Sequence, residues 1–287
     1  MPVAELRAHL RAANLWGMLS REELRAECRA SSICLPKLSP QEGRGELLDQ
    51  LLLNRFAASL EERGIPARRL GSLQAVAHVA DRFEHLESLS TCKLADAYRY
   101  MGIPSAEGLS PVLLLRRLKY AAVCSMLPLE ELRAEFKASG IPQSRLPCEG
   151  RDAEQSDQIR AILLLQLCSD AFETRRVPTQ LLMSVTQASE LAARIESVES
   201  MELEELVREF QELHLPVTDD MCKREMVDQL RLVALWGLLP LEGLRSECRV
   251  RGVSEAGVGY ERNGARQLEQ LRDLLHWSLF RRAFEDR

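Results

Sequence analysis

The sequence predicts an all-α protein built as a tandem array of helical units. One fifteen-residue stretch is written three times, the later part of the chain matches the earlier part at a constant offset, and residues typical of strands and turns are few. A fixed period indicates stacked units that bury their apolar faces against one another, because a single unit cannot bury its own. We therefore predict a helical repeat array without a β-sheet.

The template of the repeat is residues 127–141, which read LPLEELRAEFKASGI. The copies beginning at Leu19 and Leu239 match it at ten and eight of fifteen positions, respectively. The later two copies are 112 positions apart, whereas the first two are 108 apart, which places an insertion of four residues near residues 142–157. The expected organisation is a partial unit at 1–18, a first repeat at 19–126, a second repeat at 127–238 and a partial third repeat at 239–287.

Length and composition agree with an array. A chain of 287 residues is near the upper limit for a single core. Gly (15), Pro (12) and aromatic residues (5%) are scarce, whereas Leu, Ala, Glu and Arg dominate, which favours helices. The net charge is −5, with both signs interspersed, which is typical of solvated helix surfaces and argues against a polyanion footprint.

Each repeat is expected to contain five helices. The opening helix starts with the capping box Ser20-x-x-Glu23 and buries Leu24 and Cys28, which lie four residues apart on one face. Apolar spacing of three and four residues marks the later helices. In the first repeat these are a helix around Leu47 to Phe56, a longer third helix from Leu70 to Leu86, a helix from Leu94 to Met101 and a helix that begins at about Pro111.

Most of the short helices end in Gly followed by an apolar residue, as at Gly64-Ile65 and Gly140-Ile141. This pattern indicates a Schellman-type stop, in which Gly takes the left-handed conformation and the next side chain folds back on the helix. Ser32, Arg176 and His214 occupy the same position without being Gly. We expect these three residues to adopt left-handed backbone at a cost of roughly 1 kcal/mol each.

The eight cysteines show no C-x-x-C pair and no regular spacing, which fits neither a zinc site nor a disulfide framework. Cys28 and Cys248 align with Phe136, and Cys124 aligns with Trp236, so we interpret them as reduced core thiols. A reducing intracellular compartment is expected. The most apolar windows fall well short of the ~20 residues that a membrane helix needs, so no transmembrane segment is expected.

Residues 201–232 resemble the SAP motif, which consists of a helix, a loop and a second helix. The resemblance is carried by Leu206, Phe210, Leu215-Pro216, Lys223, Met226 and Leu230. Residues 90–118 match less closely, and the three template copies keep the first helix but have longer loops. The resemblance implies two short helices per motif and DNA or RNA binding through basic residues at the start of the second helix.

Lys223 and Arg224 are the nucleic-acid candidates that this resemblance selects. The residues 112 positions earlier are Pro111 and Val112, so the basic pair is not repeated. Affinity for nucleic acid grows with the number of phosphates neutralised, and two cations neutralise few. We interpret three other basic clusters as solvated helix faces and not as phosphate-binding sites. These clusters are Arg68-Arg69, Arg116-Arg117 with Lys119, and Arg281-Arg282.

No catalytic, cofactor-binding or metal-binding residues are assigned, because the five histidines are scattered and no nucleotide, metal or nucleophile motif occurs. The chain begins inside the repeat pattern, without the pattern of a signal or transit peptide, so either a targeting region was removed before this numbering or a full cap never existed. Near its other end, Trp277, Phe280 and Phe284 are candidates for a partner surface, with internal packing as the alternative.

Two function classes follow. The first is a non-enzymatic adaptor or accessory subunit whose helices contact other proteins in a larger assembly. The second is a SAP-type DNA- or RNA-binding protein. SAP-like arrays are similar to accessory pieces of organellar complexes in protists, including photosynthetic ones. That resemblance favours the chloroplast stroma or the mitochondrial matrix over the nucleus or cytosol.

Overall fold

The computed structural model describes residues 3–33, 43–103, 108–146, 151–217, 221–255, 258 and 264–285, and the side chains within these ranges except those of residues 3–10 and 280–285. Over these ranges the chain forms 15 α-helices and no strand. The expected all-α fold is therefore confirmed. Two short 3-10 turns, Gln143–Arg145 and Thr179–Leu181, complete the secondary structure of this part of the chain.

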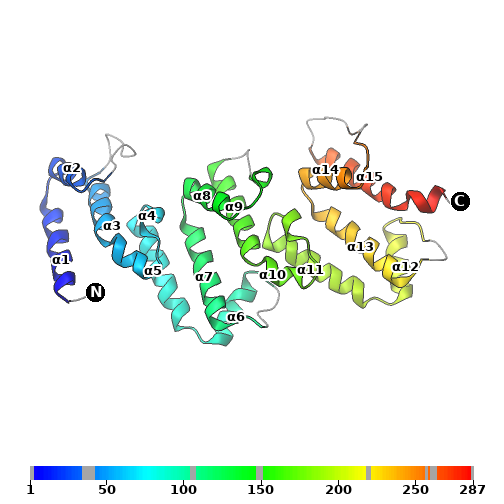
Figure 1. The fold of residues 1–287 in the computed structure, drawn as a ribbon, viewed down its shortest axis with the longest axis horizontal. Helices are drawn as coiled ribbons and strands as arrows, with labels where there is room; N and C mark the ends of the chain where they lie inside the picture. The colour runs from blue at the N-terminus through cyan, green and yellow to red at the C-terminus, as the bar shows by residue number, and fades with distance from the viewer. Residues whose placement is uncertain are drawn as a thin grey trace. The chain divides into compact units, whose positions relative to one another are not determined.

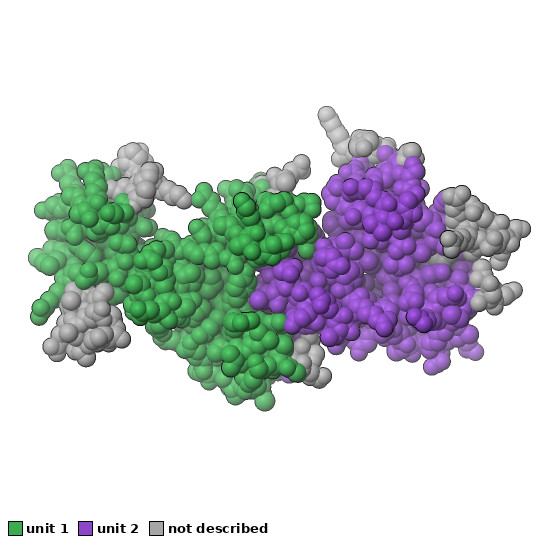
Figure 2. Space-filling model, viewed as in Figure 1, with its two compact units in different colours: residues 1–98, 108–160 green, residues 99–107, 161–287 purple. Residues whose placement is uncertain are grey.

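The first of two compact units comprises residues 1–98 and 108–160, shown in green in Figure 2. In it α2 packs on α3, α3 contacts α4 and α5, and α5 lies along α7 (Figure 1). Its helices are α1 (Val3–Met18), α2 (Arg21–Ala30), α3 (Arg44–Glu62), α4 (Ala67–Leu70), α5 (Leu73–Ser88), α7 (Pro111–Met126) and α8 (Leu129–Ala138). The boundary to the second unit falls within α6 (Thr91–Tyr100) and α9 (Asp152–Leu167).

The second unit comprises residues 99–107 and 161–287. Here α11 lies along α13, α12 also packs on α13, and α14 pairs with α15. Its helices are α10 (Ser169–Glu173), α11 (Val185–Ser200), α12 (Leu203–Glu212), α13 (Lys223–Leu238), α14 (Leu241–Val250) and α15 (Gly264–Glu285).

Helices at matched sequence positions have matched bounds. The helices α11, α12, α13 and α14 begin and end 112 residues after α5, α6, α7 and α8, respectively. The same agreement holds at an offset of 108 between α2 and α8. Equivalent apolar spacing and equivalent caps therefore give helices of the same length.

The aligned core positions are filled by different side chains at equal burial. Cys28, Phe136 and Cys248 are each fully buried on their short helices, as the alignment predicts. In the second unit Leu206 and Phe210 belong to a core cluster that also contains Met226. A small thiol and a large ring thus occupy the same kind of position, and their neighbours must compensate for the difference in volume.

The three non-glycine stops adopt the expected left-handed backbone. The φ angles of Ser32, Arg176 and His214 are 54°, 56° and 55°. The following apolar residue closes each stop, as where the amide of Leu215 donates to the carbonyl of Phe210 at 2.8 Å. This prediction is confirmed, and the capping box of Ser20 with Glu23 is also present.

The long third helix predicted from Leu70 to Leu86 is wrong as one element. It is interrupted at Gly71, whose φ is 70°, and α5 starts only after Ser72, whose hydroxyl caps the amide of Ala75. Apolar spacing alone did not reveal the break. The side chain of Leu70, at the end of α4, is buried, and so are the apolar side chains along one face of α5.

Six cysteines lie in the part of the chain that the structure describes, and all six are free thiols. Cys28, Cys124, Cys168 and Cys248 are buried, which agrees with their interpretation as core residues, whereas Cys92 and Cys222 are exposed. Among the described residues, no group of acidic, histidine and cysteine side chains is arranged to hold a metal ion. None of the described helices has the length and apolar character to cross a membrane.

Candidate binding grooves

The first unit contains a groove of about 450 Å³ that is lined by the end of α3 and by residues of α4, α5, α7 and α8. Its floor is apolar and includes Phe83, Val123 and Leu127, while cationic side chains stand around it. The lining cations are Arg63, Arg69, Arg116 and Lys119. Arg63 ends α3 and Arg69 lies in α4, whereas Arg116 and Lys119 lie in α7. The two sets meet here because α5 contacts α3, α4 and α7.

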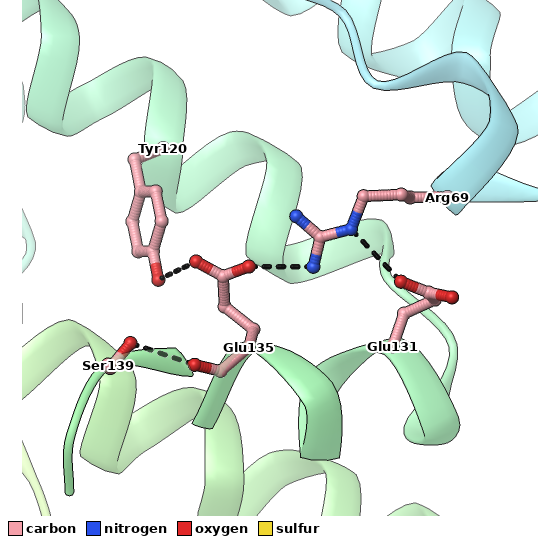
Figure 3. A network of polar contacts seen from close by, with 5 residues as sticks. All are labelled: Arg69, Tyr120, Glu131, Glu135 and Ser139. Atoms are coloured by element: carbon pink, nitrogen blue, oxygen red, sulfur yellow. Dashed lines mark hydrogen bonds and ion pairs between the residues drawn. The ribbon is translucent and has the colours of Figure 1, made fainter. Parts of the chain in front are cut away.

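One wall of this groove is a polar network centred on Glu135 of α8 (Figure 3). Arg69 of α4 donates to Glu135 at 2.6 Å and to Glu131 at 3.0 Å. The hydroxyl of Tyr120 donates to the other oxygen of Glu135 at 3.0 Å. Ser139 donates to the backbone carbonyl of Glu135 at 2.9 Å. The network ties α4, α7 and α8 together, and both oxygens of the Glu135 carboxylate accept hydrogen bonds within it.

The titratable groups next to this network stay in their neutral forms at neutral pH. Burial raises the pKa of the Cys124 thiol to about 11. Burial, reinforced by the charge of Glu135, raises the pKa of the Tyr120 phenol well above its usual range. A protonated thiol is a poor nucleophile, so these residues supply packing and hydrogen bonds to the groove.

The rim of the groove carries two ion pairs between helices. Arg63 pairs with Glu84 at 3.2 Å, and Lys119 pairs with Glu87. The ammonium of Lys119 also lies 4.7 Å from the centre of the Phe83 ring. Exposed pairs of this kind are worth at most about 1 kcal/mol, so their cations can exchange an internal carboxylate for one on a ligand.

A groove at matched positions lies in the second unit, lined by Pro178, Ile195 and Leu235, which come 112 positions after Pro66, Phe83 and Val123. Arg175 pairs with Glu196 at 3.1 Å and Arg231 with Glu199 at 3.5 Å, each 112 positions after the corresponding pair of the first unit. Asp228 stands where the first groove has Arg116, so that cation is not repeated. The volume of this groove is about 410 Å³. Sequence reasoning missed both grooves, although the matched offsets of their basic and acidic residues were a usable signal.

Two of the basic clusters interpreted as solvated faces contribute to the first groove. Arg69 lies in its polar wall, and Arg116 is exposed on its rim without an ion pair or hydrogen bond to the described residues. Arg117 is not solvated, because its side chain is buried and donates to the hydroxyl of Tyr98 at 2.7 Å. The interpretation of residues 116, 117 and 119 as one solvated face is therefore wrong for Arg117.

The nucleic-acid candidates stand apart from the grooves, at the N-terminus of α13. Lys223 and Arg224 are exposed, and the ammonium of Lys223 lies 3.9 Å from Glu202. Glu225 caps the same helix by accepting from the amide of Cys222 at 2.9 Å. Carboxylates thus accompany the basic pair, which lowers the positive potential available to a phosphate.

The partner-surface candidates lie on α15. Trp277 is 58% exposed, which agrees with a surface position. The side chains of Phe280 and Phe284 lie outside the described ones. Leu53 and Leu165 occupy the positions that align with Trp277 in the earlier units, and both are buried.

The described residues define an all-α protein with surface grooves at matched positions of its two units. Searches against protein-family models, curated proteins and solved structures found no match to this chain.

Proposed function

We propose that the chain is a tandem helical array with a period of about 112 residues and that it acts as a non-enzymatic adaptor. Its helices would contact other proteins in a larger assembly, in a reducing compartment such as an organelle matrix. The proposal keeps the divisions of the sequence at residues 19, 127 and 239. Support for the period comes from the equal offsets of matched helices, caps and left-handed stops.

The observation that carries the adaptor function is the pair of matched grooves. Each has an apolar floor and a cation on its rim that pairs with a glutamate of a neighbouring helix, at positions that correspond between the units. Such a surface suits a protein segment that brings apolar side chains for the floor and carboxylates for the rim. A nucleic-acid backbone would form ion pairs with the cations through its phosphates but would make no apolar contact with the floor of the groove.

A protein partner is also supported by the surroundings of the basic residues. Lys223 stands close to Glu202, and the rim cations Arg63 and Lys119 each stand close to a glutamate. Nucleic-acid binding needs several phosphates to be neutralised at once, so several of these carboxylates would have to be displaced together. The SAP-type alternative gains no support from this geometry.

The adaptor proposal is tested by isolating the tagged chain from its native cells and measuring its mass in solution. We expect a stable complex that contains another protein at fixed stoichiometry and is weakened by the double variant Arg63→Glu/Arg116→Glu. The matched control is Arg55→Glu/Arg82→Glu, which reverses two exposed cations of α3 and α5 outside the groove lining. A chain that is isolated alone, or a complex that survives groove reversal, would contradict the proposal.

A gel-shift titration at low salt examines the alternative directly. Under the adaptor proposal, DNA and RNA are not retained at micromolar concentrations of the chain. Retention that disappears in Lys223→Glu/Arg224→Glu would establish the SAP-type function instead.

A further inference from the structure

The two grooves carry opposite charges at one matched position. Arg116 lines the first groove, and Asp228, which comes 112 positions later, lines the second. Each is the sixth residue of its helix, α7 or α13, and each is exposed. The floor is apolar in both units, with Phe83 in the first groove and Ile195 at the corresponding place in the second. The grooves therefore have similar floors but differ in the charge that an incoming segment meets.

In the first groove, three of the four cations among the described lining residues can pair with a ligand. The guanidinium of Arg116 has no ion pair or hydrogen bond to another described residue. Arg63 and Lys119 each pair with a glutamate of α5, and the side chains of these glutamates are 65% and 50% exposed. Such exposed pairs stabilise the fold little, so a carboxylate of a ligand can replace the internal one. Arg69 differs, because it donates to two glutamates of α8 (Figure 3).

In the second groove, the matched cation is already paired with two carboxylates. Arg231, which corresponds to Lys119, lies 3.5 Å from Glu199 and 3.6 Å from Asp228, and its side chain is only 13% exposed. The other cation of the described lining is Arg176, in the segment after α10. A carboxylate placed beside Asp228 would therefore meet a like charge and would have to compete with two internal partners for Arg231.

We propose that the first groove selects an acidic segment of a partner protein and that the charge at Arg116 decides this selectivity. An apolar side chain of the segment covers Phe83 and Val123, which line the groove, while a carboxylate next to it pairs with Arg116. At the second groove, Asp228 repels the same carboxylate. Charge complementarity of this kind chooses between partners. This inference rests on the proposed adaptor function, and it implies that the two grooves do not hold two copies of one partner segment.

The test titrates the full chain with two peptides in low salt and follows binding by isothermal titration calorimetry. The acidic probe has the sequence Glu-Glu-Leu-Phe-Glu-Glu, and in the neutral probe Gln replaces each Glu; both peptides have capped ends. We expect one binding site per chain for the acidic probe and an affinity at least about tenfold higher than that of the neutral probe. The difference should shrink as salt is added, because screening weakens ion pairs between exposed groups.

Two reciprocal substitutions exchange the charge between the grooves. Arg116→Asp should weaken binding of the acidic probe about tenfold or more, and Arg116→Gln should weaken it by a smaller factor. Asp228→Arg should add a second site per chain for the same probe. The control is Arg82→Asp, which makes the same change of charge at an exposed residue of α5 outside the groove lining and should leave the affinity unchanged. Circular dichroism checks that each variant is folded.

Equal affinities for the two probes, or a native chain with two sites for the acidic probe, would overturn the proposal. An Arg116→Asp variant that binds as tightly as the native chain, or an Asp228→Arg variant with a single site, would also overturn it. A chain that binds neither probe rejects the acidic segment. The adaptor function itself still stands in each of these cases if the native complex requires Arg63 and Arg116.

Discussion

Arg69 and Glu135 join two helices that lie 66 residues apart in sequence, with the guanidinium of one donating to the carboxylate of the other at 2.6 Å. The side chain of Glu135 is 19% exposed, compared with 37% for Glu131, the second partner of Arg69. Glu135 also accepts from Tyr120, so its carboxylate is the more constrained of the two. The two pairs therefore differ in what their loss should cost.

We expect Glu135→Gln to lower the free energy of unfolding by about 1–2 kcal/mol, because a partly buried, charge-assisted hydrogen bond is lost. Glu131→Gln should cost less than about 1 kcal/mol, since that pair is better screened by solvent. Urea unfolding followed by circular dichroism measures both. Equal effects of the two substitutions would argue against Glu135 as the centre of the network.

The left-handed stops predict stabilising substitutions. Ser32→Gly and His214→Gly should each raise the free energy of unfolding by up to about 1 kcal/mol, because Gly removes the steric cost of a positive φ. The matched control is Gly140→Ala, which introduces that cost at a stop where φ is 70°. Thermal melts that show the opposite order would mean that contacts of the native side chains outweigh backbone strain.

His276 predicts a pH dependence of the second unit. Burial lowers the pKa of this histidine, an effect strengthened by Arg272 and opposed by Asp273. The ring lies 5.8 Å from that of Trp236, which also contacts Arg251 at 5.0 Å. Because the folded state holds His276 neutral, stability is full above the unfolded pKa of about 6.5 and declines as pH falls below it.

The measurement compares melting temperatures at pH 7.5 and pH 5.5. The wild-type chain should lose more on acidification than His276→Gln, which has no imidazole to protonate. Equal losses in both chains would place the acid sensitivity elsewhere.

The thiols predict a sharp order of alkylation. Cys92 and Cys222 are exposed and should react first with iodoacetamide. Cys124 is buried with its pKa raised to about 11, so roughly one molecule in a thousand carries the thiolate at pH 8. Peptide mass spectrometry of the native chain should therefore find Cys124 unmodified until denaturant is added. Early labelling of Cys124 would show that the groove opens readily.

Much of the helical arrangement follows from local sequence. The capping box at Ser20 and Glu23, and the left-handed conformation of Arg176, could be predicted because caps and stops depend on residues within one turn of each helix end. The break at Gly71 was missed for the opposite reason. The apolar spacing continues across it, since both α4 and α5 face the same core.

The candidate site was less accessible to sequence reasoning. Lys223 and Arg224 were selected by resemblance to a motif, whereas the groove residues Arg63, Arg69 and Lys119 come from three different helices or their ends. Their convergence depends on how α5 packs against α3, α4 and α7. The spacing of residues along the chain indicates which side chains are neighbours within one helix, but it does not indicate which helices pack together.

The sequence by itself determined that this chain is helical, where most of its helices end and which apolar face of most helices is buried, because these properties arise from backbone preferences and apolar periodicity within each helix. Tertiary packing decided that Arg117 is buried beside Tyr98, that Glu135 receives both Arg69 and Tyr120, and that Leu15 stays exposed. Those outcomes depend on which helix lies next to which, and the energy of each contact exists only once two distant segments have met.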